Sequence, residues 1–263
     1  MPATELASID GAIAPTAEAS IPLKDDGLYR GDGVFEVIRL YDGRPFELDA
    51  HLDRLQRSAA AIELPVEREA FESEIAALLQ RNGDADAQLR LLLTRGGHRI
   101  ALIEPAADYG EQVRLATVTY QPTVILTGVK SLSYAANMQA TRLAKAQGAD
   151  EALLVRPDGI VLEPPTSTIF WATGDTLFTP SLEAGILDSI TRRVVVAELD
   201  VVEAELPLDD LLAADEAFLA STNREVQPVM AVDDVALEPG PRTAAAKQAF
   251  ARALERALGA PAS

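Results

Sequence analysis

The chain has 263 residues, of which 48% are hydrophobic and 24% charged, and a net charge of −18. This composition is typical of a folded globular protein with one large domain or two modest ones. The negative charge disfavours a general role in binding nucleic acid or anionic membranes. Cysteine is absent and only two histidines occur, so disulfides are excluded and we expect no metal site.

The N-terminal residues lack a basic segment followed by a long apolar one. Apolar runs elsewhere fall short of the roughly 20 residues that cross a membrane. Together with the absence of cysteine, which favours a reducing compartment, this predicts a cytoplasmic protein without a membrane anchor.

The first half of the chain combines strand and helix patterns. Residues 33–41 are β-branched and aromatic, and an Asp-Gly turn leads from them to a short second arm, which predicts a hairpin. Apolar residues then recur every three or four positions from 48 to 62, which predicts a helix capped by Asp49. Further elements are expected in this order: a helix at 67–81, a strand at 88–95, a loop containing Gly and Pro, and a strand at 113–121.

The second half continues with short strands between helices. The expected elements are a helix at 134–147, strands at 151–156 and 160–163 around a Pro-Asp-Gly turn, strands at 167–172 and 176–180, a helix from Ile190 capped by Ser189, a strand at 216–221 and a C-terminal helix at 243–258. We therefore expect an α+β fold with mainly antiparallel sheets and flanking helices. The predicted domains are 1–121 and 129–263, joined by a linker at 122–128.

Lysine is scarce enough that each one can be judged individually. There are four lysines against nineteen arginines, and Lys24, Lys145 and Lys247 have surface-like contexts. Lys130 follows the apolar run VILTGV, and an apolar setting lowers the pKa of an ammonium group and favours the neutral amine that adds to carbonyls. A strand lysine that extends its amine to water is the alternative that the local sequence leaves open.

Three weaker signals point to a ring nitrogen and a phosphate. Glu163 ends an apolar segment and could pair with a protonated pyridine nitrogen, or be an exposed acid. Residues 189–191 open a helix, whose free N–H groups suit a phosphate, although many helix starts bind nothing. Arg54 could supply a positive charge to that phosphate, or form a surface ion pair with Asp53 or Glu47.

Seen together and in order, eight segments resemble the class IV, or fold-type IV, aminotransferase family, over roughly residues 25 to 230. They are GDGVFE (31–36), HLDRL (51–55), TRG (94–96), KSLSY (130–134), GADEALLV (148–155), GIVLE (159–163), STIF (167–170) and GILDSITR (185–192). This family includes branched-chain and D-amino-acid aminotransferases, R-selective amine transaminases and aminodeoxychorismate lyase. The resemblance implies a two-domain fold like that of D-amino-acid aminotransferase, and pyridoxal 5′-phosphate as the cofactor.

The resemblance also implies roles for individual residues. Lys130 matches the lysine that binds the cofactor covalently, Tyr134 the tyrosine that donates to its phenolic oxygen, and Glu163 the acid facing its ring nitrogen. The other residues expected at the cofactor are Arg54, Leu187, Ser189, Ile190, Thr191, Ser221 and Thr222. Residues expected at the substrate are Phe35, Arg90, Arg99, Thr166 and Asn223.

Substrate choice is the least determined feature. Phe35-Glu36-Val37 resembles the branched-chain and D-amino-acid enzymes, so the leading hypothesis is transfer of an amino group from a hydrophobic or small amino acid, or an amine, to a 2-oxo acid. Arg90 and the segment KSLSYAANM keep open an aminodeoxychorismate lyase that releases 4-aminobenzoate and pyruvate.

Several positions depart from the family pattern. Arg99 resembles the carboxylate-binding arginine of D-amino-acid enzymes, but the motif around it is incomplete. Pro164-Pro165 replaces small residues after Glu163, and Asp188 would place a negative charge beside the phosphate. These departures leave a third reading, a degenerate member that binds the cofactor without catalysis. The resemblance further implies a homodimer.

Overall fold

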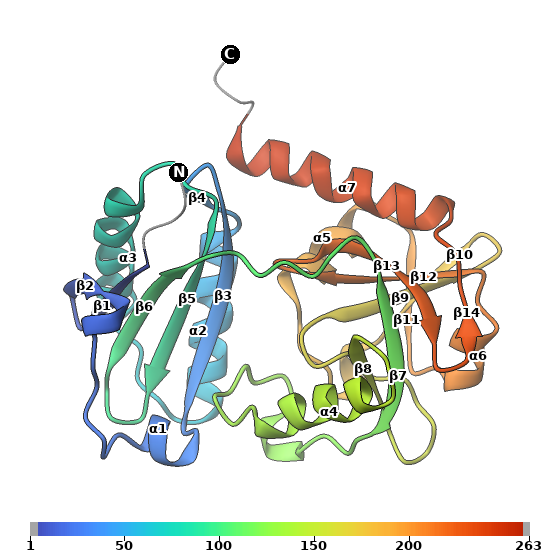
Figure 1. Cartoon of the computed structure of the whole chain (residues 1–263), viewed down its shortest axis with the longest axis horizontal. Helices are drawn as coiled ribbons and strands as arrows, with labels where there is room; N and C mark the ends of the chain where they lie inside the picture. Colours follow the sequence, from blue (N-terminus) through green and yellow to red (C-terminus); the bar gives the residue numbers. More distant parts are fainter. Residues whose placement is uncertain (1–4, 260–263) are drawn as a thin grey trace. The chain divides into compact units, whose positions relative to one another are not determined.

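The computed structural model describes residues 5–259, which group by their contacts into two units (Figure 1). The first unit holds the described residues up to Ala107 together with Val129–Tyr134. The second holds Asp108–Gly128 and the described residues from Ala135 onward. This grouping differs from the predicted domains at 108–121 and 129–134, and the predicted boundaries of the folding domains stay a prediction.

The first unit is built on a six-stranded antiparallel sheet with the strand order β2-β1-β6-β5-β3-β4. Its strands are β1 (Leu6–Ile9), β2 (Ala12–Pro15), β3 (Gly33–Tyr41), β4 (Arg44–Pro45), β5 (Ala87–Thr94) and β6 (Arg99–Glu104). Its helices are the short η1 (Thr16–Glu18), α1 (Asp26–Arg30), α2 (Leu48–Ala61) and α3 (Arg68–Asn82).

The two faces of this sheet have different surroundings. Helix α2 packs on β3, and α3 packs on β1 and β6 (Figure 1). Because successive side chains of a strand point to opposite faces, the strand residues in the core with α2 and α3 define a helix face; they include Val34, Ile38, Leu89, Leu91, Ala101 and Ile103. The alternate residues define what we call the far face, which carries Phe35, Val37, Gln88, Arg90, Leu102 and Glu104.

Most predicted elements of the first half are confirmed, with two corrections. The expected helix cap is wrong: α2 begins one residue before Asp49, and its N-cap is Glu47 in a left-handed conformation without a side-chain cap. The expected loop between the strands at 88–95 and 113–121 contains strand β6. Only pairing with β1 and β5 makes Arg99–Glu104 a strand.

The second unit is built on an eight-stranded mixed sheet in the order β11-β10-β9-β12-β13-β7-β8, with β14 paired to β13. Its strands are β7 (Val113–Thr119), β8 (Glu151–Val155), β9 (Thr168–Thr173), β10 (Thr176–Pro180), β11 (Val201–Ala204), β12 (Glu216–Ser221), β13 (Glu225–Val232) and β14 (Val235–Ala236). Its helices are η2 (Val124–Leu126), α4 (Ala135–Ala146), η3 (Leu182–Ala184), α5 (Ile190–Glu198), α6 (Leu208–Leu212) and α7 (Pro241–Leu258). Helix α4 packs on β7 and β8, while α5 and α7 pack on β12.

The expected strand at 160–163 is not a strand. After the turn at 157–159 the chain makes isolated bridges, from Val161 to Val155 and from Ile160 to Pro207, and a few backbone hydrogen bonds to β8, but no continuous strand. Ser189 does cap α5, and its side chain accepts a hydrogen bond from the backbone N–H of Arg192. Among the described residues, no helix is long and apolar enough to cross a membrane.

Candidate active site

Lys130 lies in the first unit, at the edge of the sheet beside the start of β3. Its carbonyl accepts a hydrogen bond from the backbone N–H of Phe35 at 3.0 Å, and its own N–H donates to the hydroxyl of Ser58 on α2 at 3.1 Å. These two bonds hold the backbone between strand and helix. The Nζ atom lies 4.2 Å from the centroid of the Phe35 ring, which is on the far face.

Tyr134 completes an aromatic cluster at this position. Its ring meets the ring of Phe35 edge to face, with centroids 5.3 Å apart. Lys130 itself is half-buried. The amine of Lys130 therefore has aromatic carbon on one side, an environment that removes part of its hydration.

The apolar run before Lys130 is not the buried segment that its composition suggested. Val124 and Ile125 belong to the 3₁₀ turn η2, and both are 83% exposed. The aromatic cover of the amine comes instead from the ring of Phe35, a residue far from Lys130 in the sequence, and that ring in turn contacts Tyr134.

Arg54 is buried on the helix face and is not a surface residue. Its Nε and Nη2 atoms donate to the two carboxylate oxygens of Glu36, each at 2.7 Å. The Nδ1 atom of His51 lies 2.8 Å from Glu36 Oε2. The alternative partners considered from sequence, Asp53 and Glu47, are not the ones found here, and Asp53 instead pairs with Arg68.

The charges of Glu36 and Arg54 largely compensate each other within the first unit, where His51 is their third partner. Burial by itself raises the pKa of Glu36, but the charge and hydrogen bonds of Arg54 outweigh burial and hold the pKa well below its ordinary value. Burial is the largest effect on His51 and lowers its pKa, against the opposing influence of Glu36. At neutral pH the trio thus consists of a carboxylate, a guanidinium and a neutral imidazole.

The two candidate substrate arginines lie on opposite faces of the sheet. Arg99 is on the helix face, where its guanidinium bonds to Glu74 and Glu67, at 3.0 and 2.6 Å. Arg90 is on the far face, the face of Phe35, and its Nε donates to Glu104 at 2.5 Å.

In the second unit, Glu163 lies next to the segment that leads into α5. Its Oε1 accepts a hydrogen bond from the backbone N–H of Leu187 at 2.8 Å. Ser189 then caps the helix, and the side chains of Ile190 and Thr191 in its first turn are buried. This hydrogen bond connects Glu163, the candidate partner of the ring nitrogen, to the segment just before the helix start that is the candidate phosphate-binding site.

The negative charge of Asp188 beside this helix start has a partner. Arg193, one turn into α5, donates from Nε to Asp188 at 2.8 Å, and its Nη2 forms a second short bond to the same carboxylate. The pairing is bidentate, which compensates the charge locally. The departure from the family pattern at Asp188 is therefore compatible with a phosphate.

The remaining candidate residues lie at one end of the second sheet. Strand β12 ends at Ser221 and is antiparallel to β9, which begins at Thr168, so the turn after β12 and the loop before β9 share an edge. The turn contains Thr222 and Asn223, and the loop contains Thr166. The side chain of Thr166 donates to Glu151 at 3.1 Å.

Glu151 also anchors the turn itself. It is buried and accepts a 2.8 Å bond from Arg224, whose backbone N–H donates to Ser221 at 3.4 Å. Loop and turn are therefore held by one carboxylate that the sequence did not single out.

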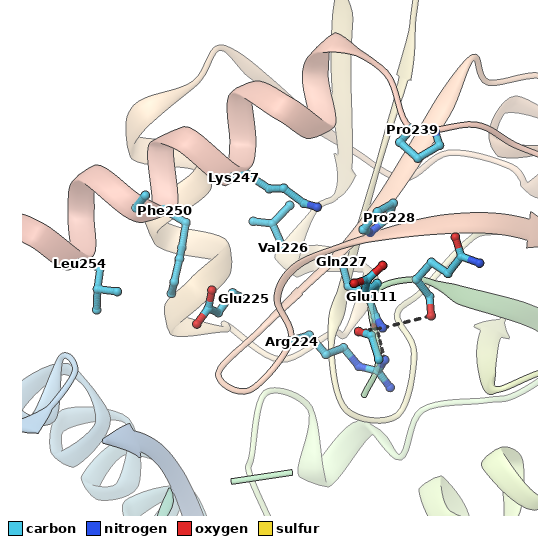
Figure 2. A pocket seen from close by; sticks show the side chains of 13 residues that line it. Glu111, Arg224, Glu225, Val226, Gln227, Pro228, Pro239, Lys247, Phe250 and Leu254 are labelled. Carbon is cyan, nitrogen blue, oxygen red and sulfur yellow. Dashed lines mark hydrogen bonds between the residues drawn. The ribbon is translucent and has the colours of Figure 1, made fainter. Parts of the chain in front are cut away.

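A cavity of about 640 Å³ also lies in the second unit (Figure 2). Figure 2 shows Lys247, Phe250 and Leu254 of α7 along one side and residues 224–228 along the other. It contains none of the residues expected at the cofactor or the substrate. The candidate site therefore rests on the chemistry of its residues and not on this cavity.

The polar residues that sequence reasoning missed are Glu36, His51, Ser58, Glu104 and Glu151. A signal existed for His51 and Ser58, which lie three residues before and four residues after Arg54 on the side of α2 that faces the sheet. Glu36 likewise falls at an inward position of β3. Glu104 and Glu151 carry no local signal, because only their partners on distant segments make them notable.

Comparison with known proteins decides the family. The chain matches the profile of the amino-transferase class IV family over residues 33–232. This chain is a class IV aminotransferase. The family and the pyridoxal-phosphate-dependent transaminase expected from the sequence are thereby confirmed, and the expected α+β fold is confirmed by the helices and sheets of both units and by solved structures of the family.

Individual relatives agree with this assignment. The aminotransferase is 35% identical over 250 residues to a provisionally named branched-chain-amino-acid aminotransferase of Methanocaldococcus jannaschii, covering 86% of this chain and 87% of that protein. It is 31% identical over 261 residues to the D-alanine aminotransferase of Bacillus licheniformis, covering 89% and 92%. The crystal structure of a branched-chain aminotransferase from Thermoproteus uzoniensis with norvaline superposes with a TM-score of 0.87 at 30% identity, covering 94% of this chain and 93% of that one.

Proposed function

We propose that this aminotransferase moves the amino group of an uncharged amino acid, hydrophobic or small, to a 2-oxo acid, with Lys130 as the catalytic residue. The observation that carries the proposal is the position of the Lys130 amine against Phe35 and beside Tyr134 on the far face of the first sheet. Branched-chain and D-amino acids are the donor classes that the named relatives suggest, and an amine is a further candidate.

The residues present fit pyridoxal 5′-phosphate. A lysine amine with partial aromatic cover, a carboxylate that is held by a backbone N–H, and a capped helix start with buried first-turn residues match the aldehyde, ring nitrogen and phosphate of that molecule. When bound, the cofactor supplies an electron-withdrawing ring that stabilises negative charge at the substrate Cα.

Each protein group then has a defined task. Lys130, as a neutral amine, would move a proton from the substrate Cα to the C4′ atom of the cofactor in the first half of the cycle, and in the opposite direction in the second half. Glu163 would hold the ring nitrogen of the cofactor in its protonated form, and the N–H of Leu187 fixes the orientation of that carboxylate. Tyr134 would donate to the phenolic oxygen, and Arg54, Ser189, Ile190, Thr191, Ser221 and Thr222 would hold the phosphate.

For the substrate, the geometry favours Arg90 over Arg99. Arg90 shares the far face with Phe35, whereas Arg99 is bound to two carboxylates on the helix face. Phe35, Thr166 and Asn223 are the remaining residues that we assign to substrate binding. Thr166 is oriented for this by its bond to Glu151.

The anchor is tested by comparing two lysine variants. We expect the visible absorbance band of the bound cofactor to disappear in Lys130→Ala and to persist in Lys145→Ala, because Lys145 is exposed on α4. Absorbance titration with pyridoxal 5′-phosphate measures both. A band that persists in both variants would refute the assignment of Lys130.

A panel of amino donors tests the reaction. Each donor that is used should convert the absorbance of the pyridoxal form to that of the pyridoxamine form, and turnover should require a 2-oxo acid. Release of pyruvate and 4-aminobenzoate from aminodeoxychorismate without any acceptor would instead support the lyase, which Arg90 motivates.

Two broader proposals rest on family resemblance and composition. We infer a homodimer because the family works as one, and a cytoplasmic location because the cysteine-free sequence suits a reducing compartment. Sedimentation and fractionation measure these directly.

A further inference from the structure

Arg90 is not alone on the far face. Its Nε donates to Glu104 Oε1 at 2.5 Å, and Gln88 donates to the same oxygen from Nε2 at 2.7 Å. Gln88 is buried, and the side chains of Arg90 and Glu104 are each 32% exposed. A single carboxylate oxygen thus receives two hydrogen bonds, one of them from a cation, on strands β5 and β6.

The strand register places Gln88, Arg90 and Glu104 near the candidate catalytic lysine. Leu92 of β5 is opposite Phe35 of β3, and Arg90 is the next far-face residue along β5. Two residues of a strand span about 7 Å, and the Lys130 Nζ lies against the Phe35 ring. A molecule of amino-acid size that reacts at Lys130 can therefore reach Arg90.

We propose that Glu104, held in place by Gln88, determines donor specificity by compensating the charge of Arg90. With the pair formed, Glu104 compensates the charge of Arg90, and an acidic side chain of a substrate must compete with Glu104 for the arginine. Uncharged side chains face no such competition. This inference rests on the proposed function, because it concerns the same site.

The pair is well suited to a charge-only test. Glu104→Gln retains an oxygen that accepts from Arg90 and Gln88 but removes the negative charge, so packing and both hydrogen bonds can persist. The matched control is Glu67→Gln. It removes a carboxylate 2.6 Å from Arg99, on the helix face and away from Phe35.

The experiment measures binding and turnover separately. In the holoenzyme, the dissociation constants of glutarate and of pentanoate, which differ by one carboxylate, are determined by calorimetry for the wild type and both variants. We expect Glu104→Gln to strengthen glutarate binding relative to pentanoate binding about tenfold. The effect is smaller than for a fully buried ion pair, because solvent screens the partly exposed charges of Arg90 and Glu104. The kcat/KM ratio of glutamate to leucine should rise by a similar factor, whichever enantiomer is used.

Three outcomes would overturn the inference. The first is a ratio of the glutarate and pentanoate dissociation constants that does not change in Glu104→Gln. The second is a change of this ratio in Glu67→Gln as large as the one in Glu104→Gln. The third is a preference for glutarate in Glu104→Gln that remains when Arg90→Gln is added, because the preference would then not depend on Arg90. The binding ratio decides this inference, whereas absence of amino transfer in the wild type with every donor would contradict only the proposed function.

Discussion

The Glu36–Arg54 pair allows the structural role of Arg54 to be separated from its proposed role at the phosphate. Glu36 is fully buried and Arg54 is 5% exposed. Glu36→Leu leaves the guanidinium buried without its carboxylate, which costs about 3–5 kcal/mol. His51 loses its acceptor in the same variant, which adds about 1–3 kcal/mol.

Removing both charges should restore much of this loss. Replacing a buried ion pair by apolar residues of similar size is often neutral or stabilising. We expect Glu36→Leu combined with Arg54→Met to lie within about 3 kcal/mol of the wild type in the free energy of unfolding, the remainder coming from His51.

In the same double variant, the affinity for the cofactor should stay low although the free energy of unfolding recovers. A charge-assisted hydrogen bond contributes about 1.5–3 kcal/mol, so loss of Arg54 is expected to weaken pyridoxal 5′-phosphate binding about ten- to a hundredfold. Denaturant unfolding of the cofactor-free protein gives the stabilities. Titration with cofactor, followed by visible absorbance, gives the affinities.

Two different results would contradict these expectations. If the double variant binds the cofactor as tightly as the wild type, Arg54 is a structural partner of Glu36 and not a phosphate ligand. If Glu36→Leu alone unfolds no more easily than the wild type, the buried pair does not contribute as its geometry implies.

Two further predictions follow from the charges of the site. The folded-state pKa values of His51 and Glu36 are both lowered, so the free energy of unfolding should fall as pH drops below about 6.5 and more steeply below about 4.5. Glu36→Gln should make the steeper part shallower without removing it, because the pKa values of Asp10 and Asp158 are lowered as well; thermal unfolding across pH measures this, and an unchanged profile would contradict the assignment. Arg193→Ala should weaken binding of the cofactor phosphate by up to about tenfold, because Asp188 loses its compensating charge. Adding Asp188→Asn should restore the affinity, and failure to do so would show that the loss has another cause.

Local sequence patterns were sufficient to predict most helices and strands, but not which strands pair with one another. The period of apolar residues at 48–62 indicated α2, and alternation at 33–41 indicated β3. The strand at 99–104 was missed because one of its partners, β1, lies more than 80 residues earlier in the chain, and because its turn with β5 at 95–98 was read as part of a long loop. The segment at 160–163 has strand-like composition, but its backbone hydrogen bonds are divided between β8 and residues 206–208, so it forms isolated bridges and not a strand.

In the candidate site, too, some features could be predicted from the sequence and others depended on contacts between distant residues. Scarcity of lysine singled out Lys130, and the order of the motifs identified the family and its cofactor. Both are properties of residue identity and spacing along the chain, which one sequence contains in full.

Tertiary structure decided which side chains face one another. It supplied the aromatic cover of Lys130 by Phe35, the buried pairing of Arg54 with Glu36, and the placement of Arg90 and Arg99 on opposite faces of one sheet. These depend on strand register and on the approach of segments far apart in the chain, where a shift of one residue exchanges the two faces. The candidate catalytic lysine could therefore be predicted from the sequence, whereas its environment, including the arginine and glutamate proposed to act on substrate charge, required the fold.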